Sequence, residues 1–451
     1  MAIAYIEKNE ERFLDELKSF LRIPSVSTDT AHKGDVKACA DWLVDHLRNI
    51  GVPTVELHET PGHPIVYAEY LGAPGKPTYL LYGHYDVQPP DPLELWETPP
   101  FEPTVRDGKI FARGATDDKG QLFAHIKAIE AHLATNKALP VNIKLLIEGE
   151  EEVGSVNLDN WVESHRERLK CDAVIISDSS MYAPGLPAIM YSLRGLAYFE
   201  VEVTGPSHDL HSGLYGGAVP NPINEIGKII AALQNPDGTI AVPGFYDRVR
   251  PLDQAERDGF AALPFKEAEF IAETGVKGIQ GEDGYTTLER SWARPTLDFN
   301  GIIGGFTGEG AKTVLPSKAR AKFSCRLVPD QEPGEIQELV AAYIRKVASP
   351  NVKVDVHFHH GGRPVITERD HPAVLASMRA LKKSWGVDPV FIRGGGSIPV
   401  VATFSDVLKV PSVLIGLGLN DDRLHSPNEK FDLKNFYAGI RTSAYLWDEL
   451  T

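Results

Sequence analysis

The stretch Gly114-Ala-Thr-Asp-Asp-Lys-Gly120 places two adjacent aspartates, Asp117 and Asp118, where a loop is expected to become a helix. Apolar residues recur at helical spacing from Leu122 to Leu133, which predicts this helix over 118–134. A single aspartate in this position is most often an N-cap, and that is the simplest alternative. Capping explains neither the second aspartate nor the flanking glycines. A carboxylate shared by two metal ions would explain both, together with the acids and histidines that follow neighbouring strands.

Strands and helices alternate on both sides of this stretch. We expect strands at 54–57, 65–70, 78–82, 142–147, 173–176 and 413–417, and helices at 5–22, 35–50, 157–168, 372–385 and 432–449. Such alternation is typical of an α/β fold in which a mostly parallel sheet is sandwiched by helices. The chain has 451 residues, too many for one compact core, so a second domain is also expected.

The pattern changes after Arg194-Gly195. A strand at 197–204, a helix at 222–234, strands at 297–304 and 317–328, a helix at 335–348 and a strand at 352–359 follow one another. If the proline-rich, charged insertion 236–295 is set aside, the order is βαββαβ, which is typical of a ferredoxin-like α+β domain. The sequence therefore predicts a domain over 196–362, inserted into a first domain that comprises 1–195 and 363–451.

Composition excludes several functional classes. The formal net charge is −16, whereas a nucleic-acid or anionic-membrane partner requires a basic surface. The three cysteines, Cys39, Cys171 and Cys325, have no paired spacing, which argues against a disulfide framework and fits a reducing compartment. We see neither a signal peptide nor a long apolar run, so a cytoplasmic protein without a membrane span is expected.

His84 and Asp86 follow the strand predicted at 78–82. Side chains alternate between the faces of a strand, so these two point the same way while Tyr85 points to the other face. This geometry suits a metal-binding imidazole and a carboxylate that orients it. A histidine alone would more often be structural, but the pair at the carboxyl end of a strand favours a functional site.

An acidic run follows the strand predicted at 142–147 and comprises Glu148, Glu150, Glu151 and Glu152. A solvated acidic turn is the plain alternative, because most charge runs are simply exposed. However, these carboxylates would repel Asp117 and Asp178 unless cations lay among them.

Polar residues that follow four different predicted strands are expected to meet at one place. His84, the acidic run, Asp178 and His425 each follow a predicted strand, and the carboxyl ends of parallel strands open onto one crevice. Asp178 alone could be a turn residue, and His425 alone an ordinary surface histidine. Histidine nitrogen together with carboxylate oxygen suits zinc, with manganese or cobalt as alternatives.

These motifs resemble those of the dinuclear zinc peptidases that include carnosinase, the cytosolic nonspecific dipeptidase, carboxypeptidase G and succinyl-diaminopimelate desuccinylase. The matching stretches are Gly83–Val87, Gly114–Gly120, Glu150–Ser155, Ser177-Asp178, Gly205–Gly213, Phe323–Pro329 and His425–Glu429. Asp209-Leu-His-Ser-Gly213 and the long insertion are most similar to the cytosolic nonspecific dipeptidase branch. The resemblance implies a zinc-exopeptidase-like fold with an inserted lid and dimerisation domain.

The resemblance also implies roles at the metal site. One metal ion would be held by His84, Asp117 and Asp178, and the other by Asp117, Glu152 and His425. Glu151 would be the general base, and Asp86 would orient His84. The family further implies a cis peptide bond between Asp117 and Asp118.

The resemblance implies substrate contacts in the inserted domain. His211 would reach the active site of the partner subunit in a homodimer and polarise the scissile carbonyl. Arg326, Ser397, Thr313 and His360 resemble groups that hold the C-terminal carboxylate of the substrate, and His360 is a second candidate for acting across the interface.

The implied activity is hydrolysis of the peptide bond of dipeptides with a free C-terminal carboxylate, by a hydroxide that bridges two metal ions. One alternative is an N-acyl-amino-acid deacylase or desuccinylase that uses the same site. A second alternative is a non-catalytic metal- or peptide-binding protein on the same scaffold. A panel of dipeptides and N-acyl amino acids separates the two hydrolases, and the full ligand set together with Glu151 argues against the binding protein.

Overall fold

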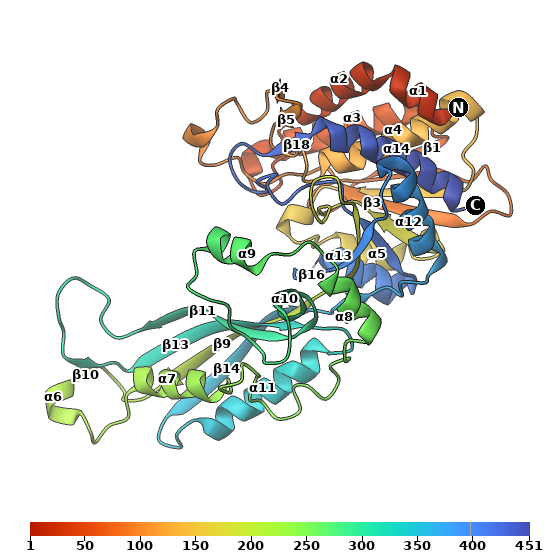
Figure 1. Cartoon of the computed structure of the whole chain (residues 1–451). Coiled ribbons are helices and arrows are strands. Elements are labelled where there is room, and N and C mark those ends of the chain that lie inside the picture. The colour runs from red at the N-terminus through yellow and green to blue at the C-terminus, as the bar shows by residue number, and fades with distance from the viewer. Residues whose placement is uncertain (397) are drawn as a thin grey trace. The chain divides into compact units, whose positions relative to one another are not determined.

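The computed structural model describes residues 1–396 and 398–451 (Figure 1). The chain divides into two compact units. The first unit comprises Met1–Tyr191, Thr367–Ile392 and Pro399–Thr451, and the second comprises Ser192–Ile366 and Arg393–Ile398. The role predicted for Ser397 falls outside the described residues.

A large sheet that is parallel at its centre takes most of its strands from the first unit. Its strands are β1 (Thr54–His58), β2 (Ile65–Tyr70), β6 (Asn142–Glu148), β3 (Thr78–His84), β7 (Ala173–Ile176), β17 (Ser412–Ile415), β8 (Ala188–Leu193) and β15 (Val365–Ile366), in that spatial order, and β16 (Val390–Gly394) also pairs with β8. Strands β6, β3, β7 and β17 pair in parallel, whereas β1, β2, β8 and β15 join the sheet through antiparallel pairs. The predicted α/β class with a mostly parallel central sheet is confirmed.

Six helices bury a common core with this sheet. They are α1 (Ala2–Lys8), α2 (Glu10–Leu21), α3 (Lys33–Asn49), α4 (Lys119–Asn136), α12 (Pro372–Trp385) and α14 (Leu433–Glu449). Two short helices of the same unit, α5 (Leu158–Ser164) and α13 (Pro399–Thr403), contact each other. Helix α4 is buried along most of its length, which explains its run of apolar residues. In the described chain, no helix is both long enough and apolar enough to span a bilayer.

The single helix expected at 5–22 is wrong. The chain forms α1 and α2 with a break at Asn9, whose φ of −113° and ψ of 12° are not helical. The Asn9 amide donates a hydrogen bond to the backbone carbonyl of Tyr5, which competes with the helical pattern.

The structure also contains a small sheet that the sequence did not indicate. It consists of β4 (Thr104–Arg106), β5 (Lys109–Phe111) and β18 (Lys430–Asp432), in the order β18–β5–β4. Strands this short carry too few residues to show a period of two, so periodicity could not reveal them.

The second unit has an antiparallel sheet in the order β11–β13–β9–β14, formed by β9 (Gly195–Thr204), β11 (Thr296–Gly304), β13 (Lys318–Leu327) and β14 (Lys353–Gly362). Helices α7 (Pro222–Ala232) and α11 (Pro333–Val347) share its core, so the order is the βαββαβ that the sequence predicted (Figure 1). Residues 197–203 of β9 alternate between buried and half-buried positions.

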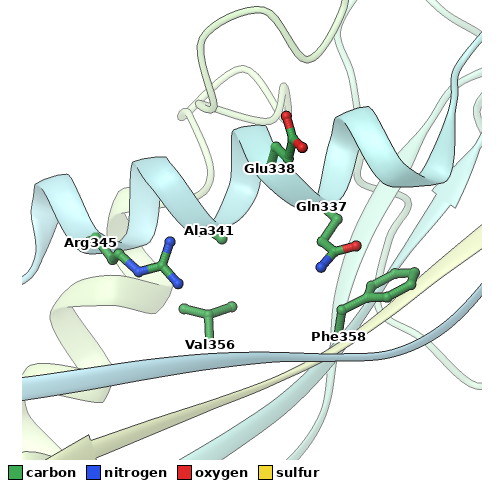
Figure 2. Close-up of a pocket in the computed structure, with 6 residues that line it drawn as sticks. All are labelled: Gln337, Glu338, Ala341, Arg345, Val356 and Phe358. Atoms are coloured by element: carbon green, nitrogen blue, oxygen red, sulfur yellow. The ribbon is translucent and has the colours of Figure 1, made fainter.

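The remaining elements of the second unit are short. The insertion 236–295, for which no structure was predicted, forms α8 (Gln254–Ala261), α9 (Glu267–Thr274) and α10 (Thr287–Ala293). Near the other end of this unit, β10 (Leu210–His211) pairs with β12 (Val314–Leu315), and α6 (Ser212–Tyr215) follows β10. A groove with a volume of about 240 Å³ lies between α11 and β14. Figure 2 shows the residues that line it, Gln337, Glu338, Ala341, Arg345, Val356 and Phe358.

Candidate metal centre

The parallel strands of the first unit carry polar residues at one edge. His84 is the last residue of β3 and Glu148 the last of β6, and these two residues pair across the sheet. Asp178 lies two residues after β7, and His425 lies in the loop that follows β17. All four strands run in the same direction, so their carboxyl ends meet at this edge.

Among the described residues, two sets of ligand atoms at this edge each lie within 4.8 Å of one another. The first set is His84, Asp117 and Asp178, and the second is Asp117, Glu152 and His425. Asp117 belongs to both: its Oδ1 is 3.2 Å from His84 Nε2, and its Oδ2 is 3.0 Å from His425 Nε2. Glu152 Oε2 lies 3.3 Å from the same nitrogen of His425. Ligand atoms that share a tetrahedral zinc ion at about 2.1 Å lie about 3.4 Å apart, so these spacings fit shared ions.

The hydrogen bonds of His84 show that a cation suits this place. The side chain is fully buried, and its Nδ1 lies 3.1 Å from the backbone carbonyl of Asp86, which can only accept a hydrogen bond. With the proton on Nδ1, Nε2 presents a lone pair. This buried Nε2 makes no hydrogen bond to any described residue, although carboxylate oxygens of Asp117 and Asp178 lie 3.2 and 4.0 Å away. A cation among these acceptors replaces their repulsion by coordination.

The pKa values of the carboxylates also show that these buried acids lack counter-charges. Burial, together with the charge of Asp117, raises the pKa of Glu152 to about 8 and the pKa of Asp178 to about 7. Burial also acts to raise the pKa of Asp117, but the hydrogen-bonded imidazole of His425 and the neighbouring imidazole of His84 outweigh it and hold that pKa below its usual value. Acids that resist ionisation in a buried cluster gain their counter-charges when metal ions bind.

The acidic run after β6 divides between structural and site positions. Glu148 accepts hydrogen bonds from the hydroxyls of Tyr82, at 2.7 Å, and Ser155, at 2.8 Å. Glu150 accepts from the backbone N–H of His63 at 2.9 Å. These two carboxylates stabilise the turn. Glu151 and Glu152, the last two acids of the run, remain for the candidate metal centre.

Asp86 positions those last two acids. Its Oδ1 accepts from the backbone N–H of Glu151 at 3.3 Å and its Oδ2 from that of Glu152 at 3.1 Å. Gln88, which sequence reasoning missed, donates to Glu152 Oε2 at 2.8 Å. It continues the face that carries His84 and Asp86, so strand alternation could have indicated it. Burial raises the pKa of Glu151, whose carboxyl group also lies within the field of Asp117.

The peptide bond between Asp117 and Asp118 is cis, as the resemblance implied. Asp118 occupies the N-cap position of α4, but its side chain makes no capping hydrogen bond to a described backbone group. Its Oδ2 instead accepts from the backbone N–H of His84 at 3.3 Å. Capping therefore does not explain the pair of aspartates.

A further acid and imidazole group, formed by Glu16, His46 and Glu130, has a different explanation. The ammonium of Lys127 lies among these three, 2.6 Å from His46 Nε2 and 2.7 Å from Glu130 Oε2, and it also bonds Glu16. The lysine already provides the positive charge, so this group is an internal ion network.

The second unit brings His211 and Thr313 together. His211 is exposed at the N-cap of α6, and its Nδ1 accepts from the backbone N–H of Gly213 at 2.9 Å. The backbone carbonyl of Thr313 accepts from Ser212 at 3.1 Å. The other ring nitrogen of His211, Nε2, lies on the side of the ring away from the hydrogen bond between Gly213 and Nδ1.

The second unit also places Arg326 and His360 on either side of β9. Arg326 pairs with Leu196, and His360 pairs with Tyr198, against which its ring stacks with centroids 5.4 Å apart. These residues and His211 belong to the second unit, so the roles predicted for them at the metal centre stay predictions.

Known peptidases are similar to this chain over most of its length. The model of Peptidase family M20/M25/M40 matches residues 80–449. The Cys-Gly metallodipeptidase dug1 of Schizosaccharomyces pombe is 38% identical over 97% of this chain and 95% of its own length. The Beta-Ala-His dipeptidase of Homo sapiens is 34% identical over 99% and 91%. The solved structure of the di-peptidase Dug1p from Saccharomyces cerevisiae superposes with a TM-score of 0.80 and 33% identity, over 100% of this chain and 98% of that one.

Proposed function

The chain belongs to peptidase family M20/M25/M40, and from this membership we propose that it hydrolyses the peptide bond of dipeptides that carry a free C-terminal carboxylate. It is a metal-dependent dipeptidase like the relatives it matches, and the family implies divalent metal ions. The observation that carries the proposal is the position of Asp117, which offers one carboxylate oxygen to each of two ligand sets.

The proposed ligands are His84, Asp117 and Asp178 for one ion, and Asp117, Glu152 and His425 for the other. The histidine and carboxylate donors suit zinc, with manganese or cobalt as alternatives. Two such ions supply Lewis acidity toward the scissile carbonyl and lower the pKa of a water molecule.

The chain's own residues then move protons and hold geometry. Glu151 takes the proton of the attacking water and delivers it to the leaving amine. Asp86 supports this step because its two carboxylate oxygens accept from the backbone N–H groups of Glu151 and Glu152. It also orients His84, whose Nδ1 lies 3.4 Å from Asp86 Oδ1. His211 donates a hydrogen bond to the oxyanion that develops on the carbonyl.

The C-terminal carboxylate of the substrate is recognised in the second unit. Arg326 presents a planar fork suited to a carboxylate, and Ser397, Thr313 and His360 complete the set. Anchoring the carboxylate fixes how far the scissile bond lies from the C-terminus, so the enzyme acts as a carboxypeptidase on very short peptides.

A substrate panel tests this function. Metal-loaded protein is expected to hydrolyse dipeptides with a higher kcat/KM than N-acyl or N-succinyl amino acids. Amidation of the C-terminus should lower kcat/KM by about 10- to 100-fold, because a charge-assisted hydrogen bond contributes about 1.5–3 kcal/mol. If N-acyl amino acids had the highest kcat/KM, the deacylase alternative would be favoured. If metal-loaded protein hydrolysed none of the substrates, the binding-protein alternative would be favoured.

We also propose a homodimer, supported by large apolar side chains that are exposed on the second unit. Leu214 and Tyr215 follow His211 in α6, and Leu214 is 78% exposed. Ile302 and Ile303 of β11 are 61% and 64% exposed. Large apolar side chains exposed in this way are typical of a surface that another chain covers.

Co-expression of two inactive variants tests whether His211 acts across that interface. His211→Ala and Glu151→Gln are each expected to be inactive alone. In a mixed dimer, the site with an intact Glu151 would receive His211 from the other subunit, so random assembly should restore roughly a quarter of the wild-type activity. If the mixed dimers stay inactive while they form normally in sedimentation, His211 does not act across the interface.

The reducing environment of the cytoplasm is our proposed location. Among the described residues, the three cysteines are all free, and Cys39 and Cys325 are buried. Free, buried thiols fit a compartment that does not form disulfides.

A further inference from the structure

Glu429 is a buried carboxylate to which neither the sequence analysis nor the mechanism above gives a role. Its side chain is fully buried and accepts four hydrogen bonds. Oε1 accepts from the backbone N–H groups of Thr116, at 2.9 Å, and Asp117, at 3.1 Å. Oε2 accepts from the backbone N–H of Gly114, at 2.9 Å, and from the Arg113 guanidinium, at 2.8 Å. One side chain therefore holds most of the loop that presents Asp117.

Glu429 also belongs to the loop that carries His425, a ligand of the second set. It stands four residues after His425 and directly before β18. Strand β18 pairs with β5 so that Lys430 lies opposite Phe111, and the backbone N–H of Ala112 donates to the carbonyl of Glu429 at 3.1 Å. The backbone pairing brings the two loops side by side, and the Glu429 carboxylate then fixes one against the other.

We propose that Glu429 is a positioning residue. It fixes the position of Asp117 relative to His425, and thereby sets the affinity of the centre for its metal ions. The inference rests on the proposed metal centre and adds a residue that touches neither metal nor substrate. Residues that hold metal ligands in place typically change metal affinity by about 10- to 100-fold when they are replaced.

The arrangement of donors makes a glutamine at this position a sharp test. Every partner of the carboxylate is a donor, with two at each oxygen. Whichever way the amide of Glu429→Gln turns, its NH2 faces two N–H groups that have lost their acceptor. The variant keeps the size of the side chain, so it disturbs the loop through these hydrogen bonds and not through a cavity.

Calorimetric titration of metal-free protein with Zn²⁺, repeated with Mn²⁺, measures the effect. Glu429→Gln is expected to weaken binding by about 10- to 100-fold, and at saturating metal its KM for a dipeptide should stay unchanged. The matched control is Glu130→Gln. Glu130 is also a buried carboxylate with cationic donors, Arg12 and Lys127, but it lies toward the other end of α4. The control is expected to lose thermal stability and to keep its metal affinity.

The possible outcomes distinguish a failure of the proposed function from a failure of the role inferred for Glu429. Wild-type protein that binds no ion would overturn the proposed function. Wild-type protein that binds two ions, with Glu429→Gln binding them equally tightly, would overturn the role of Glu429 alone. If Glu429→Gln does not fold without metal, the same titration of Glu429→Asp decides, because a side chain shorter by one methylene cannot reach all four donors. It should weaken binding by at least about 10-fold, and unchanged affinity would contradict the proposal.

Discussion

Replacing Glu151 by glutamine is expected to lower kcat by about 100- to 10,000-fold while the metal content stays unchanged, because the amide cannot accept the proton of the attacking water. The variant preserves the size of the side chain and the two backbone N–H bonds to Asp86 that hold the turn. Steady-state kinetics with a dipeptide, alongside metal analysis of the same sample, measures both quantities.

Glu150→Gln is the neighbouring control for this variant. Glu150 accepts hydrogen bonds from the backbone N–H of His63 and from Asn157, so its replacement should lower the melting temperature. It has no proposed part in proton transfer, and kcat should stay close to the wild-type value. If Glu151→Gln kept kcat within about tenfold of the wild type, proton transfer by this residue would be the wrong mechanism.

Replacing Asp117 by asparagine is expected to remove both ions and all measurable hydrolysis. Its two oxygens face His84 Nε2 and His425 Nε2, and an asparagine leaves one neutral oxygen and turns an NH2 toward the other ligand set. The loss should therefore reach both sets, and metal analysis after desalting measures it.

Asp178→Asn and Glu152→Gln are the controls that test whether Asp117 is a ligand of both ions. Each removes a carboxylate that belongs to one ligand set. Each is expected to weaken one ion selectively and to leave the second ion bound. If Asp117→Asn lost only the same single ion as Asp178→Asn, Asp117 would not bridge the two positions.

The parallel core of the fold could be predicted because its strands are regular and its helices amphipathic or fully apolar. His84 ends the seven-residue strand β3 and Asp178 follows the four-residue strand β7, so the meeting of parallel strand ends brings both residues to one edge. The Glu150-Glu151-Glu152 run could not be divided by periodicity, since the three acids occupy a turn. Only the positions of their hydrogen-bond partners separate the acid that holds the turn from the acids at the cluster.

The parts that escaped prediction share a different cause. The break at Asn9 depends on one side-chain bond to the backbone of Tyr5, which helical periodicity does not register. Strand β18 has three residues, and its pairing with β5 joins segments that lie more than 300 residues apart in the sequence. The role inferred for Glu429 depends on that pairing. Such long-range contacts are set by tertiary packing and leave no local pattern.

The central claim is that one carboxylate, Asp117, is shared by two metal ions. The most direct measurement is the anomalous diffraction signal of crystals grown from metal-loaded protein, with a crystal of chelator-treated protein as the reference. The account predicts two peaks per chain, about 3.5–4 Å apart, with Asp117 between them, and their loss after chelation. A single peak, or a pair of peaks in which Asp117 contacts only one, would contradict it.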